Sequence, residues 1–177
     1  MLEQEWHREM ASAPVSGVLV YGACDKAALS SLLDPYGLRV DLVKDEKPIA
    51  GSYWGDSEAG LIDDRLLVRS DTPVHSILHE ACHFICMDRN RRGELHTDAG
   101  GDYDEENAVC YLQILLAGKL SEMGQNRMLA DMDLWGYTFR LGSAGAWFEQ
   151  DSEQAKQWLI QNNIIDEFSR LSGQLRN

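Results

Sequence analysis

Hydrophobic and polar positions divide the first part of the chain into short strands around one helix. Residues 15–21 contain the run VLVY, which is typical of a strand. A helix is expected over residues 25–33 with Asp25 as its N-cap, and residues 38–43 alternate apolar and polar side chains as a half-buried strand does. The pattern therefore predicts a β-α-β unit with its two strands parallel.

Two further extended segments are expected at residues 51–54 and 60–69, the second leading directly into the next helix. A strand in that place can form the rim of a cleft, where its free backbone groups pair with an extended peptide. A plain edge strand without a ligand explains the pattern equally well. The rim hypothesis assigns substrate binding to Leu66, Leu67, Val68 and Arg69.

Residues 71–88, DTPVHSILHEACHFICMD, are apolar over most of a helical circumference, which indicates a helix buried inside a domain. Thr72 is its expected N-cap and Pro73 its first residue. His79 and His83 are four residues apart and share one helix face, with the carboxylate of Glu80 beside them. Polar groups in so apolar a helix need partners, and a metal would satisfy them.

Residues 88–104 lose this periodicity and predict a long, charged loop of the kind that often covers a functional site. The next helix is expected over about 104–120. The apolar stripe of this helix continues to Glu105. Glu106 is in line with Cys110 and Gln113 on a less apolar face. Glu105 is therefore preferred as a third metal ligand, with Glu106 as the alternative.

Two histidines and one glutamate form a standard ligand set for catalytic zinc, which keeps a fourth position open for water. His79, His83 and Glu105 would bind the zinc, and Glu80 would act as the general base that takes a proton from the metal-activated water. The expected reaction is attack on a carbonyl, with the proton passed on to the leaving amine.

Three residues are candidates to stabilise the oxyanion that develops during the reaction: Tyr137, Arg140 and His96. None of them lies in a motif. The simpler interpretation is preferred for each: a core aromatic residue, a surface or ion-paired arginine, and a solvated loop histidine. His75 is interpreted as a residue of the first helical turn.

The cysteines are too sparse for a disulfide scaffold and are expected to be reduced. A structural Cys/His zinc site is conceivable for Cys82 and Cys86, but packing as small buried hydrophobic residues is preferred. Residues 121–177 predict a helical part with helices near 127–134, 152–162 and 164–175, and with a core of aromatic side chains.

The length of 177 residues fits one domain, residues 1–177, made of portions at about 15–70, 71–120 and 121–177. The formal charge of −13 argues against nucleic acid and anionic membrane surfaces as partners. The sequence has no apolar run that could span a bilayer and no signal peptide, so a cytoplasmic protein acting on a peptide or protein is expected.

The motif His79-Glu80-x-x-His83, followed by Glu105-x-x-Ala108, resembles the gluzincin branch of zinc metallopeptidases, and within it the compact ImmA/IrrE-like enzymes. The resemblance implies a zincin-like α+β fold, in which a small mixed sheet packs on the metal helix and a second helix carries the third ligand. It implies an intracellular zinc-dependent peptidase. Val109 departs from the Asn or Asp of that family, so Asp102, Asp104 or Asp133 would have to orient a histidine instead.

Two other interpretations remain open from the sequence. One is a binding or regulatory protein that keeps the zincin-like fold and the metal without cleaving peptides. The other is a metal-free domain in which Glu80 pairs with an arginine such as Arg89 or Arg92.

Overall fold

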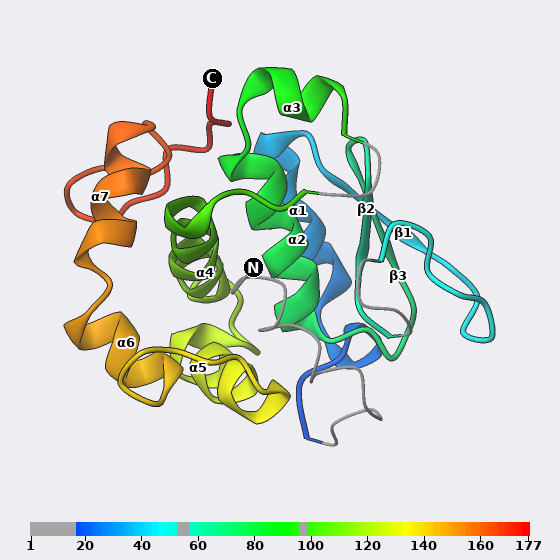
Figure 1. Ribbon diagram of the computed structural model, residues 1–177. Coiled ribbons are helices and arrows are strands. Elements are labelled where there is room, and N and C mark those ends of the chain that lie inside the picture. Colours follow the sequence, from blue (N-terminus) through cyan, green and yellow to red (C-terminus); the bar gives the residue numbers. More distant parts are fainter. Residues whose placement is uncertain (1–16, 53–56, 96–98) are drawn as a thin grey trace.

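The computed structural model describes residues 17–52, 57–95 and 99–177, and these form an α+β structure (Figure 1). The strands are β1 Arg39–Leu42, β2 Gly60–Ile62 and β3 Arg65–Val68. Within the described residues there are seven α-helices: α1 Lys26–Leu33, α2 Val74–Cys86, α3 Arg89–Gly93, α4 Tyr103–Ala117, α5 Gly124–Trp135, α6 Ala144–Gln150 and α7 Glu153–Gln161. Two short 3₁₀ helices, η1 Tyr21–Ala23 and η2 Asp34–Tyr36, flank α1. No helix among the described residues is both long and apolar enough to cross a membrane.

The three strands form a mixed sheet in the order β1-β3-β2. β1 runs parallel to β3 and β2 runs antiparallel to it, with Arg65 opposite both Arg39 and Ile62. Because β3 is the central strand, its backbone groups are already used inside the sheet. The prediction that this strand forms an open rim for a peptide is therefore wrong for Leu66, Leu67 and Val68. Arg69 follows the strand, and its backbone N–H donates to the hydroxyl of Thr72.

The first predicted strand is also wrong over its described part, residues 17–21. Val20 makes only an isolated bridge, to Pro73, and Tyr21 begins a 3₁₀ turn. The N–H of Tyr21 donates to the carbonyl of Thr72 and that of Val74 to the carbonyl of Leu19, on either side of this bridge. The pairing does not extend into a ladder, because the chain enters η1 at Tyr21 and α2 at Val74. The parallel partner of β1 is consequently β3. The helix between them agrees with the prediction, since Asp25 caps α1 by accepting a hydrogen bond from the N–H of Ala28.

Other predicted boundaries are corrected in the same way. Residues 50 and 51 form a turn, whereas 53 and 54 lie outside the described residues. The segment 60–69 folds back on itself at residues 63 and 64, where Asp63 has a positive φ of 53°. The hydroxyl of Thr72 does not cap α2 but accepts the N–H of Arg69, and the helix begins one residue later than expected.

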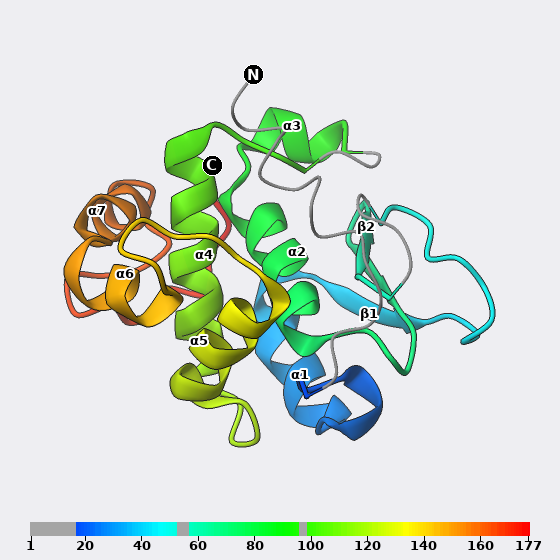
Figure 2. The ribbon, with the colours of Figure 1, turned by 60° about the horizontal axis from the view of Figure 1, so that its bottom comes forward.

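Helix α2 lies between the sheet and α4, and α4 lies between α2 and the helices α6 and α7, whereas α5 packs against both α4 and α2 (Figures 1 and 2). This central position explains why both helices are apolar on most faces. Their fully buried side chains form the core together, among them Ile77, Leu78, Ile85, Leu112 and Leu116.

The C-terminal part is helical only as far as Gln161. α5 and α7 match predicted helices, whereas α6 was not predicted as an element of its own. The helix expected at 164–175 is absent: Ile165 bridges to Leu171, and Ser169 and Gly173 have positive φ. The aromatic core is confirmed, with Trp147 stacked on Phe139 at a ring-centroid distance of 4.9 Å.

Candidate metal centre

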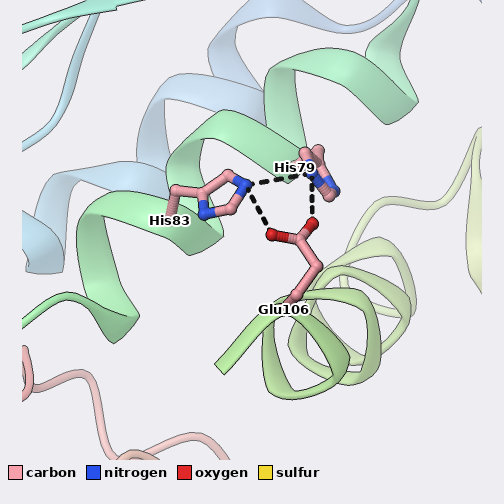
Figure 3. A group of neighbouring side chains, drawn as sticks. All are labelled: His79, His83 and Glu106. Carbon is pink, nitrogen blue, oxygen red and sulfur yellow. Dashed lines mark hydrogen bonds and ion pairs between the residues drawn. The ribbon is translucent and has the colours of Figure 1, made fainter. Parts of the chain in front are cut away.

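Three side chains from two helices converge at one point (Figure 3). α2 presents His79 and His83 one turn apart, and their Nε2 atoms are 3.1 Å from each other. The first turn of α4 presents Glu106, with Oε1 3.2 Å from the Nε2 of His79 and Oε2 3.5 Å from that of His83. Among the described residues, this is the only group of three such side chains arranged to hold a metal ion.

The spacing of these atoms fits a tetrahedral zinc ion. Ligand atoms about 2.0–2.1 Å from one zinc at tetrahedral angles are about 3.4 Å apart. The three distances in the cluster are 3.1, 3.2 and 3.5 Å. Two imidazoles and one carboxylate are also a donor set that zinc prefers. The residues present therefore fit the metal that the sequence implies.

The electrostatics of the cluster also favour a cation. Burial lowers the pKa of His79, but hydrogen bonds with Cys110 and Glu106 and the charge of Glu106 raise it, so that the pKa lies well above the ordinary value of histidine. In the metal-free state a proton on Nε2 of His79 is therefore stabilised beside the Glu106 carboxylate. A metal ion would take the place of that proton.

The preferred third ligand is corrected from Glu105 to Glu106. Glu105 is buried, as its stripe predicted, but its carboxylate accepts hydrogen bonds from Arg91 and Arg176. Glu106 is about 100° further round the helix and faces the histidines. The apolar stripe of α4 correctly predicted that Glu105 is buried. The carboxylate that faces the histidines, that of Glu106, lies instead on the face of α4 that is partly exposed to solvent.

Gln113 fixes the orientation and tautomer of His79. Its amide Nε2 donates to the carbonyl oxygen of His75 at 2.9 Å, and a carbonyl can only accept. The Oε1 of Gln113 is then the atom 2.9 Å from Nδ1 of His79, so Nδ1 must carry the proton. Nε2 of His79 is then the nitrogen that can bind a metal. Metal-binding histidines are commonly oriented in this way, by a hydrogen bond from the other ring nitrogen.

Within the described residues, none of the three carboxylates expected to orient a histidine is hydrogen-bonded to one. Asp102 caps α4 by accepting the N–H of Glu105, and Asp133 accepts the N–H of Ala144. Asp104 is exposed in the first turn of α4. The sequence did contain a signal for Gln113, because it continues the polar line of Glu106 along an otherwise apolar helix.

Tyr137 lies beside the candidate centre. Its hydroxyl is 3.2 Å from Nδ1 of His75, and its ring meets that of His79 edge-on at a centroid distance of 5.8 Å. Burial raises the pKa of the Tyr137 hydroxyl, which therefore keeps its proton at neutral pH. Burial lowers the pKa of His75 to about 3, so this histidine is neutral.

The remaining predicted site residues lie in different environments. Arg140 is exposed, and its guanidinium is paired with the carboxylate of Asp151 at the surface. His96 lies outside the described residues. Glu80 is half-buried on α2, directly after His79. Arg92, an alternative partner for Glu80, donates to the backbone carbonyls of Phe84, Met87 and Arg176.

Sequence reasoning missed Glu58, which precedes β2. Its Oε1 accepts a hydrogen bond of 2.9 Å from the indole of Trp135. Burial raises the pKa of Glu58, while the indole hydrogen bond and the charge of His79 lower it. No local pattern marks this residue, because its neighbours come from α2 and α5.

The cysteines are free thiols, as expected. Cys82 and Cys86 are fully buried, and burial raises the pKa of both well above the ordinary value. Cys110, one turn after Glu106, is buried beside His79. Comparison with known proteins adds no family to this description: no protein-family model matches the chain, and no curated protein or solved structure matches it either.

Proposed function

We propose that this protein is a zinc-dependent peptidase with a zincin-like fold, in which His79, His83 and Glu106 hold the metal. The observation that carries the proposal is the convergence of these three donor atoms at the spacing of zinc ligands. The orientation of His79 supports it, since Gln113 binds Nδ1 and Nε2 faces the other two donors.

Partial exposure of the centre favours catalysis over a closed structural site. The side chain of Glu106 is 32 % exposed, whereas those of His79 and His83 are 15 % and 7 % exposed. A structural zinc is normally enclosed by four protein ligands, and a catalytic zinc keeps one position for water and substrate. Glu106 is thus the most exposed of the three proposed ligands.

Zinc in this ligand set would polarise a substrate carbonyl and make a water molecule more acidic. Glu80, next to His79 on α2, is proposed to take the proton from that water and to deliver it to the leaving amine. A carboxylate next to the proposed ligands on the same helix is suited to accept a proton from the water and to donate it to the amine.

Tyr137 is proposed to stabilise the oxyanion that develops on the substrate carbonyl. Its ring is beside His79, and its raised pKa keeps the hydroxyl a donor at neutral pH. If Nδ1 of His75 donates to the Tyr137 oxygen, the phenolic hydrogen is available for the substrate. Arg140 is not part of this proposal, because it is paired with Asp151.

The test combines metal analysis with peptide cleavage. Purified protein is expected to contain about one zinc per chain and to cleave members of a mixed peptide library, read out by mass spectrometry. Glu80→Gln should keep the zinc and lose cleavage, and Tyr137→Phe should lower kcat by about 10²–10³ with zinc retained. Tyr103→Phe is the matched control, since Tyr103 is 59 % exposed.

The outcomes separate the competing interpretations. Zinc without cleavage in the wild type would leave a metal-binding protein that is not a peptidase. Absence of zinc, together with indifference to chelators, would reject the centre altogether. Unaltered cleavage by Glu80→Gln would show that another group is the base.

A further inference from the structure

A buried ionic cluster lies next to the candidate centre; we call it the Glu105 clamp, and it consists of Glu105, Arg91 and Arg176. Nη1 of Arg91 donates to both carboxylate oxygens of Glu105, at 2.9 and 2.8 Å. Nη1 of Arg176 donates to Oε2 at 3.1 Å. The Glu105 side chain is 4 % exposed, so both arginines hold a carboxylate that solvent hardly reaches.

The loop before α4 is shaped around this clamp. Nη2 of Arg91 donates to the carbonyl oxygens of Ala99, at 3.2 Å, and Gly100, at 2.8 Å. A Cβ atom at Gly101 would lie only 2.4 Å from the carboxylate of Glu105. Residue 101 must therefore lack a side chain for the carboxylate to stay where the arginines hold it.

Arg176 connects the clamp to the helix that carries the histidines. Its backbone N–H donates to the carbonyl of Ile85 at 3.0 Å, and its Nη1 donates to that of Cys86 at 3.2 Å. Both carbonyls belong to the last turn of α2. In Figure 1 the C-terminal end of the chain lies beside α3 and this end of α2. One side chain thus joins the end of α2 to the beginning of α4.

We propose that Arg176 and Arg91 are positioning residues for the metal ligand Glu106 and that they act through Glu105. Consecutive residues of an α-helix point about 100° apart, so a fixed direction for Glu105 fixes the direction of Glu106. The same contacts set the distance between the first turn of α4 and the histidine helix. This inference rests on the proposed function, because it presupposes that Glu106 is a ligand.

A purely stabilising role accounts less well for this arrangement. Buried ion pairs are often replaced by apolar residues of similar size without loss of stability, because removing charges from water is costly. Ion pairs do, however, fix relative orientation through directional bonds. Orientation is what a ligand in the first turn of a helix requires, since helix ends otherwise fray.

The experiment compares three arginine variants by zinc affinity and by the visible spectrum of the cobalt(II)-loaded protein. Arg176→Ala is expected to bind zinc about 10–100-fold more weakly, and its cobalt spectrum should move toward that of Glu106→Gln. Arg176→Lys should recover much of the affinity, since Arg176 uses the single atom Nη1 for both side-chain bonds. Arg170→Ala, an exposed arginine of the same segment, should behave as wild type.

Each outcome decides the proposal. Wild-type affinity and spectrum in Arg176→Ala would overturn it, and so would a lower melting temperature of the metal-free protein with unchanged affinity. Should Arg176→Ala fail to fold, Glu105→Gln replaces it, because that variant keeps the volume and weakens the same bonds. A wild-type protein that binds neither zinc nor cobalt would reject the proposed function and this inference together, whereas normal wild-type binding isolates the test of the clamp.

Discussion

At the scale of single residues, the tautomer of His79 is set by an amide that is itself oriented by a main-chain carbonyl. Gln113 is fully buried and bonded at both ends, to His75 and His79. A carboxylate in this place would draw positive charge onto the imidazole, whereas a neutral amide only orients the ring. The positive charge on the imidazole of His79 therefore depends on whether α4 places an amide or a carboxylate beside it.

Replacing this amide gives the first prediction. Gln113→Leu should weaken zinc binding by about 10–100-fold, because His79 loses its orienting partner. Competition with a chromophoric chelator measures the affinity, and nitrogen shifts of His79 in the zinc-loaded protein report the protonated Nδ1. Gln157→Leu is the control, since Gln157 is exposed on α7 and its side chain donates a hydrogen bond to Glu153 on the same helix. Equal affinities for both variants would contradict the role of Gln113.

At the scale of elements, α2 carries two thiols as well as two histidines. Cys82 and Cys86 are fully buried, and the pKa of each is raised well above the ordinary value of about 8.5. Folding therefore keeps these thiols protonated at a pH where the unfolded chain ionises them. The native state binds more protons than the unfolded state above that pH, so the free energy of unfolding decreases as pH rises.

The second prediction follows from this decrease in the free energy of unfolding with rising pH. Metal-free protein in a reducing buffer should lose stability from about pH 8.5 upward, with a slope of up to about 1.4 kcal/mol per pH unit for each buried thiol. Urea denaturation between pH 7.5 and 9.5 measures it. Cys82→Ala should reduce the slope more than Cys24→Ala, because Cys24 is only half-buried. The same slope in both variants would speak against the buried thiols as its cause.

The elements also show which information is local. The Asp25 cap of α1 was predicted correctly, because donor and acceptor are three residues apart. The choice between Glu105 and Glu106 was not, because it depends on Arg91 and Arg176, which are 14 and 71 residues from Glu105. Strand β3 was misjudged for the same reason: its own residues do not reveal that β1 and β2 pair on both sides.

At the scale of the whole molecule, the centre lies between elements that are far apart in the sequence. The histidines come from the helix that follows the sheet, and Glu106, the proposed third ligand, comes from a helix that packs against the C-terminal part. The helix that carries His79 and His83 and the helix that carries Glu106 were predictable because each has its own apolar periodicity. The positions of residues 17–21 and of residues 164–175 were not, since both follow from contacts with distant parts of the chain.

The third prediction concerns this molecule-wide dependence on the metal. Zinc at 100 times its Kd should add about 2.7 kcal/mol to the free energy of unfolding, because the ligands are assembled only in the folded chain. Thermal unfolding with zinc and with a chelator measures the effect, with calcium as a control ion. His79→Ala should show no response to zinc. A response in that variant as large as in the wild type would place the binding elsewhere.

The bond between Arg176 and Glu105 also orders events during protein synthesis. The two residues are 71 positions apart, and chains grow at about 5–20 residues per second. Roughly 4–14 seconds therefore separate the addition of Glu105 from that of its second arginine. During this interval the nascent chain already contains both histidines and Glu106, but not the residue that joins the ends of their helices. The proposed metal centre would therefore lack the Arg176 contact until about 71 residues after Glu105 have been added.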